Sequence, residues 1–140
     1  MEIQEKKLGR IFRLRFAQGE DFFAQISKFA HDKGIKEASL FIIGALEKGQ
    51  MITGFLTTEG YNVNRRTIGH REFFALGNLT WPINRPPAVE ENVPWERPQP
   101  YAHIHLALGP DVGVEQKEVL VGHLSKALVR GIFLDLYELL

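Results

Sequence analysis

Prolines are distributed unevenly along this chain, because six of the seven lie between Pro82 and Pro100. Proline has no backbone N–H to donate and its ring obstructs a helix, so this segment can form neither a central strand nor a helix interior. At 140 residues the chain has the usual size of one domain, and the segment is too short to separate two domains. We therefore predict that residues 81–100 form an ordered surface loop or a mobile lid within a single domain.

Upstream of the prolines, the sequence patterns indicate one strand and one helix. Residues 8–16 alternate, with phenylalanine and leucine on one face and arginine on the other, which predicts a half-buried strand. Apolar residues then recur at helical spacing from Phe22, after an acidic pair and before Gly34, which suits a C-terminal cap. These signals predict a helix over about residues 20–33.

Most of the remaining sequence has strand character. We predict strands over 37–46, 50–57, 72–80, 101–108, 119–124 and 132–139, turns at 47–49 and 111–113, and an irregular polar segment at 58–71. The pattern of residues 115–130 also fits a helix, so both alternatives remain open there. Several strands with one helix indicate an α+β fold. We expect a compact single domain over residues 1–140, mostly antiparallel β-sheet with one main α-helix and the proline-rich loop 81–100.

Composition excludes several classes of function. Lys+Arg and Asp+Glu both total 17, so the net charge is zero, which argues against nucleic-acid binding through whole-molecule charge. The absence of cysteine excludes disulfides, cysteine-ligated zinc, iron–sulfur clusters and thiol catalysis. The longest apolar run, residues 38–46, is much shorter than the roughly 20 residues of a membrane span, and the N-terminus is charged. We expect a soluble, cytoplasmic protein.

Three histidines form the main candidate site. His103 and His105 are two residues apart in a predicted strand, so their side chains share a face, and His123 lies in a second predicted strand. Three neutral imidazoles with an open fourth position form the donor set of a catalytic zinc site. We therefore predict that His103, His105 and His123 bind a divalent metal, zinc. The alternative is two solvent-facing strand histidines and an unrelated third.

Other segments offer less specific chemistry. The segment with Arg65, Arg66, His70 and Arg71 is either a phosphate-binding patch or a solvated loop. Glu72 is the candidate catalytic carboxylate, as a general base or a partner of a ligating histidine, with a surface carboxylate as the alternative. The aromatic residues that flank the proline-rich loop either line a pocket or pin the loop to the domain; they are Trp81, Trp95 and Tyr101.

Five short motifs occur in the order that is typical of a known family. FAQGEDFFAQISKFA resembles the start of the PPC domain (plant and prokaryote conserved domain), and residues 42–46 resemble its "giGal" strand and turn. EFFALGNL is similar to its "E…l.GNi" strand, while residues 103–105 and 122–124 resemble its "HlH" and "GGHL" motifs. The resemblance extends over about residues 8–139, and five motifs in the same order are specific.

This resemblance implies a fold, an assembly and a metal site. PPC domains are α+β domains on an antiparallel sheet that assemble as homotrimers. They accompany AT-hook segments in plant nuclear proteins, and stand-alone prokaryotic members carry a DNA-binding designation without an established role. Some members hold a metal through histidines that correspond to His103, His105 and His123. The fold is also similar to that of acetolactate decarboxylase, a zinc enzyme.

The chain departs from the family pattern at several positions. Val121 replaces the first glycine of GGHL, Phe133 stands where an acidic residue is expected in the last strand, and loop 81–100 is longer and richer in proline. There is no Arg-Gly-Arg-Pro core of an AT-hook. Two hypotheses follow. The first is a trimeric binding or regulatory protein with a histidine metal site and a DNA or protein partner. The alternative is a small zinc-dependent enzyme, hydrolase or decarboxylase-like, that uses the same histidines.

Assembly and DNA binding can also be predicted. The strands contain more apolar residues than one helix can cover, and exposed apolar patches favour contact with another chain. Together with the assembly that the resemblance implies, this predicts a homotrimer. The candidates for this surface are Phe41, Ile43, Phe55, Phe73, Leu106, Leu108, Phe133 and Leu134. Because the net charge is zero, we expect direct binding to duplex DNA to be weak or absent at physiological salt.

Overall fold

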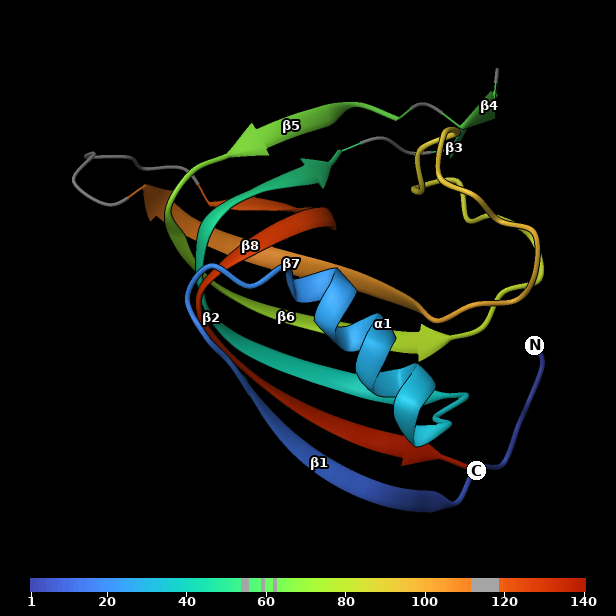
Figure 1. Ribbon diagram of the computed structural model, residues 1–140. Helices are drawn as coiled ribbons and strands as arrows, with labels where there is room; N and C mark the ends of the chain where they lie inside the picture. The colour runs from blue at the N-terminus through green and yellow to red at the C-terminus, as the bar shows by residue number, and fades with distance from the viewer. Residues whose placement is uncertain (54–55, 59, 62, 112–118) are drawn as a thin grey trace.

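The sheet and its closure organise the molecule. The computed structural model describes residues 1–53, 56–58, 60–61, 63–111 and 119–140. Six strands form one antiparallel sheet in the order β1-β8-β7-β6-β2-β5, and two short strands, β3 (Leu56–Thr57) and β4 (Gly60–Tyr61), pair with each other. The six are β1 (Leu8–Phe16), β2 (Ala38–Ile52), β5 (Arg65–Ile68), β6 (Arg71–Thr80), β7 (Tyr101–Asp111) and β8 (Leu120–Leu139). Strand β8 also pairs with β2, so β2, β6, β7 and β8 form a closed ring (Figure 1).

One helix covers the concave side of this sheet. Helix α1 (Phe22–Lys33) begins after Asp21, whose side chain accepts a hydrogen bond from the Ala24 N–H, and it ends at Gly34, which has a left-handed φ of 66°. Its buried face carries Phe22, Ile26 and Ala30 into the core. In the described part of the chain, no helix is long and apolar enough to cross a bilayer.

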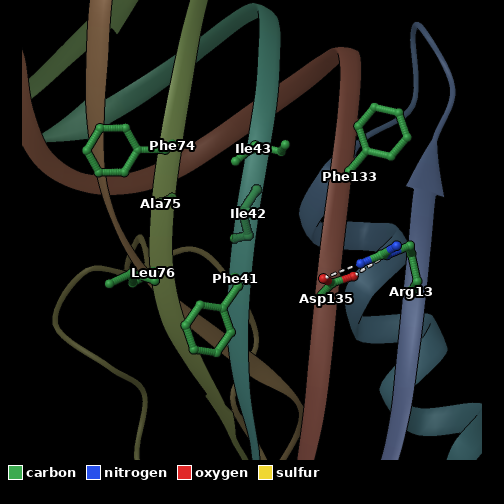
Figure 2. Close-up of a pocket in the computed structure, with 9 residues that line it drawn as sticks. All are labelled: Arg13, Phe41, Ile42, Ile43, Phe74, Ala75, Leu76, Phe133 and Asp135. Atoms are coloured by element: carbon green, nitrogen blue, oxygen red, sulfur yellow. Dashed lines mark hydrogen bonds and ion pairs between the residues drawn. The ribbon is translucent and has the colours of Figure 1, made fainter.

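Side-chain alternation gives the sheet an inner and an outer face. Inward residues such as Leu40, Ile104 and Leu134 are almost fully buried with the helix. On the outer face, several large apolar side chains stay exposed and lie beside one another across the strands (Figure 2). This outer apolar patch consists of Phe41, Ile43, Phe74, Leu76 and Phe133.

The predicted α+β fold is confirmed, including the strand at 8–16, the helix and the loop at 81–100. The predicted turn at 47–49 is wrong, because β2 runs continuously from Ala38 to Ile52. The turn-like residues lie where the β2–β8 register shifts, so they bend a strand instead of reversing it. Residues 65–68, predicted as irregular, form β5 against the second half of β2.

The structure also decides between a strand and a helix for most of residues 115–130. Residues 120–130 belong to β8 and are not helical, whereas 115–118 and most of the predicted turn at 111–113 lie outside the described residues. Three of the predicted surface residues, Phe41, Ile43 and Phe133, are exposed. Phe73, Leu106, Leu108 and Leu134 are buried instead, because their positions face the core, and Phe55 lies outside the described residues.

We expect Gly44→Ala to destabilise the fold by about 3 kcal/mol, because β2 and β8 approach too closely for a side chain there. A Cβ at Gly44 would lie 2.2 Å from Gly131 O and 2.8 Å from Ile132 Cα. Gly131→Ala is the matched control, since a Cβ there meets nothing within 4 Å. Urea unfolding of both variants measures the difference, and equal stability of the two would contradict the close approach.

Candidate metal centre

Strand register brings the three histidines together. His103 and His105 occupy alternate positions of β7, so both side chains lie on the outer face of the sheet. In the antiparallel pairing of β7 with β8, His105 lies directly opposite His123. Two residues of one strand and their cross-strand neighbour therefore form one cluster.

The geometry of this cluster suits a metal with imidazole ligands. His103 Nε2 and His105 Nε2 are 3.0 Å apart, and one ring nitrogen from each of the three histidines lies within 4.8 Å of the others. Two nitrogens bound to a tetrahedral zinc ion at 2.0–2.1 Å are separated by about 3.4 Å. The side chains thus need only small movements to bind one ion, with a fourth position left for another group.

Burial lowers the pKa of two of these rings. His123 is only 8% exposed, and burial lowers its pKa to about 4, helped by the nearby charges of His103, His105 and Arg65. The pKa of His103 is also lowered, mainly by burial and then by His105. Imidazole binds a metal in its neutral form. The lowered pKa values therefore allow these two rings to bind a metal at pH values below 6.5.

Aromatic residues next to the prolines enclose one side of the cluster. The Tyr101 hydroxyl lies 3.4 Å from His123 Nε2, and the Tyr101 ring stacks on His103 at 6.1 Å between centroids. Trp95 packs edge-on against Tyr101 and donates from Nε1 to Pro82 O at 3.1 Å. Trp81 instead donates to Ile35 O, which pins the start of the loop to the end of α1. Of the two predicted roles, Trp81 therefore pins the loop, while Trp95 and Tyr101 line a cavity beside His123.

The other predicted site residues are distributed differently. Glu72 is exposed on β6, four residues from Leu76, which lies opposite His105, so it is about 13 Å away along the strand. Among the described residues, the cluster that could hold a metal contains no carboxylate. Arg71 is buried, with 3% exposure, and donates to Gly109 O.

Arg65 is brought close to the histidine cluster by the fold. The prediction of a solvated loop is wrong for this residue, because it belongs to β5 and lines the cavity that also contains His123. Its guanidinium donates to Ala88 O of the proline-rich loop at 3.1 Å. Arg65 and His123 are far apart in the sequence and are brought together by the pairing of β5 and β8 with β2. No local sequence pattern therefore connects them.

The closed sheet, its single helix and the histidine cluster define a class of small α+β domains. The chain belongs to the Plants and Prokaryotes Conserved (PCC) domain family, also abbreviated PPC, whose family model matches residues 3–134. The resemblance inferred from the five motifs is thereby confirmed. None of the curated proteins matches the sequence.

Solved structures support the same relationship. A metal-containing protein from Archaeoglobus fulgidus is 26% identical, with a TM-score of 0.74 over 99% of this chain and 86% of that chain. A plant- and prokaryote-conserved protein from Pyrococcus horikoshii is 25% identical, with a TM-score of 0.73 over 100% of this chain and 85% of that chain. A "putative DNA-binding protein" from Ralstonia eutropha JMP134 shares the fold at 18% identity, with a TM-score of 0.66 over 91% of this chain and 76% of that chain.

We expect His105→Ala to abolish zinc binding while the fold is retained, because the exposed imidazole is one of three that could hold the ion and it lies outside the core. Elemental analysis after dialysis against zinc measures the bound ion, and His70→Ala is the control, because His70 lies outside the cluster. Stoichiometric zinc in a protein that lacks both His103 and His105 would contradict this assignment.

The stability of the metal-free protein should fall as the pH is lowered from 6.5 to 4. In this range the unfolded chain takes up a proton at His123 that the folded chain excludes, since the folded pKa is about 4. After allowance for solvent access, the loss is about 2 kcal/mol. Urea unfolding in a chelator at several pH values tests this, and a His123→Asn variant should show a shallower pH dependence. An unchanged slope in that variant would show that another group is responsible.

Proposed function

We propose that this chain is a homotrimeric binding or regulatory protein that holds zinc on His103, His105 and His123. The observation that carries the proposal is the convergence of the three imidazoles at the β7–β8 pairing. Three nitrogen donors without a thiolate suit zinc and disfavour magnesium and calcium, which prefer oxygen ligands. The metal-containing relative from Archaeoglobus fulgidus supports a metal on this fold.

The absence of a carboxylate at the cluster favours a binding role over catalysis. A hydrolase or decarboxylase-like enzyme would need an acid or base within reach of the metal and substrate. Among the described residues, Tyr101 and Arg65 lie beside the cluster, Glu72 lies far along β6, and the one carboxylate that lines the cavity with His123, Glu90, is held in an ion pair with Lys126. A bound metal would supply a Lewis-acidic position for a ligand, while the protein residues would orient that ligand.

The outer apolar patch supports the trimeric assembly that family membership implies. Its side chains come from β2, β6 and β8 and lie on the side of the sheet opposite α1 (Figure 2). Phe41, Ile43, Phe74 and Leu76 are each at least half exposed, at 50%, 62%, 62% and 58%. Contiguous apolar surface of this kind marks an interaction site, and the ion pair of Arg13 with Asp135 lies at its edge.

A DNA partner is compatible with the family but receives little support from this surface. Several arginines are already engaged within the chain, because Arg10 binds Glu138, Arg13 binds Asp135 and Arg65 binds Ala88 O. Zero net charge gives no general attraction to phosphate. We therefore propose that any DNA contact is indirect or made through a protein partner.

Light scattering tests the assembly. We expect a mass of about 48 kDa, three times 16.0 kDa, at micromolar protein concentration. Ile43→Glu places a charge in the patch and should give a folded monomer, since Ile43 is outside the core. Ile83→Glu is the control because Ile83 is exposed in loop 81–100, away from the patch. A wild-type monomer would refute the trimer.

A further inference from the structure

A second binding feature adjoins the histidine cluster. Loop 81–100 and the sheet enclose a cavity of about 290 Å³, with His123 and Tyr101 in its wall. This volume is at the lower end of the range for small-molecule sites, about 300–1,000 Å³. The cavity and the cluster therefore share His123, Tyr101 contacts both, and the cavity suits a small ligand.

Part of the cavity wall is apolar. Trp95 and Val93 come from the loop, whereas Phe23 comes from the first turn of α1. Trp95 is held in place by its hydrogen bond to Pro82 O and by its edge-on contact with Tyr101. A flat or branched hydrocarbon body fits against aromatic walls of this kind.

The polar part of the wall carries excess positive charge. Lys126 and Glu90 form an ion pair at 3.0 Å, so their charges offset each other. Arg65 makes its described hydrogen bonds to two uncharged oxygens, Gln50 Oε1 at 3.3 Å and Ala88 O at 3.1 Å. A guanidinium has five N–H donors, so it can hold these oxygens and still bind an anion.

Arg65 also lies close to the metal ligands. Ile52 of β2 pairs with Arg65 on one side and with His123 on the other, and both of these residues line the cavity. A zinc ion on the histidines would add two positive charges at the same end. A guanidinium and a metal that face one cavity favour a carboxylate, because its two oxygens can bind both.

We propose that this cavity binds a small monocarboxylate with an apolar body, such as an aromatic acid of benzoate size. The carboxylate lies between Arg65 and His123, and the apolar body packs against Trp95 and Phe23. This inference rests on the proposed metal site for one end of the ligand. The protein would then act as a receptor for a small organic acid, which deepens its proposed binding or regulatory role.

Benzoate binding to the zinc-loaded protein, followed by isothermal titration calorimetry, tests the proposal. We expect saturable binding of benzoate and no binding of benzamide, which has the same shape without the charge. Arg65→Gln should weaken benzoate binding by at least about tenfold, because the charged donor pair is lost. Arg66→Gln is the matched control, since Arg66 is the next residue on β5 and does not line the cavity.

A second pair of measurements separates folding and metal effects from ligand binding. Arg65→Lys keeps the charge and should retain part of the affinity, and thermal unfolding of each variant checks the fold. If the protein binds benzoate in an Arg65-dependent manner but no zinc, the metal assignment fails and the cavity proposal stands. The cavity proposal is overturned if zinc binds and benzoate does not, or if Arg65→Gln binds benzoate as tightly as the wild type.

Discussion

The pairing of β8 with three other strands is the constraint on which the rest of the structure depends. Over its 20 residues, β8 pairs with β7 at its start, with β2 along most of its length and with β1 at its end. The β2 contact requires the backbones to meet at Gly44 and Gly131, where a side chain on β2 would overlap a carbonyl. This contact closes the sheet around α1, and the same strand then places His123 opposite His105.

The outer face of the sheet carries the outer apolar patch and the histidine cluster next to each other. Leu76 pairs with Phe41 on one side and with His105 on the other, so a continuous cross-strand row runs from the outer apolar patch to the histidine cluster. A subunit seated on the patch would therefore lie beside His105. In such an assembly, small molecules would reach the histidines from the cavity beside loop 81–100, because His123 forms part of the wall of that cavity.

Local patterns predicted the elements whose signals lie within a few residues. The strand at 8–16, the helix with its Asp21 and Gly34 caps, and the shared face of His103 and His105 depend on alternation, periodicity or capping. The prediction of a turn at 47–49 was wrong because the same residue types occur in a β-bulge, which bends a strand, and in a turn, which reverses the chain. Here the strand continues, with register shifts in its pairing with β8. Phe73 and Phe74 are adjacent and both apolar, so the alternation of the strand does not indicate which of them faces the core. The structure shows that Phe73 is buried and Phe74 is exposed. The contacts of His123 and Arg65 depend on pairings between distant segments, which no local pattern encodes.

The proline-rich loop has the properties of a fixed wall. Its prolines restrict the unfolded chain, which reduces the entropy lost when the loop is ordered. Three contacts fix it to the domain: Trp81 donates to Ile35 O, Arg65 donates to Ala88 O, and Glu90 pairs with Lys126. Arg65 gives the cavity wall its excess positive charge and also makes one of these contacts, so the same side chain orders the loop and would face a bound anion. An anion bound by the remaining N–H donors of Arg65 would leave its bond to Ala88 O in place, so the loop would keep its position when the cavity is filled.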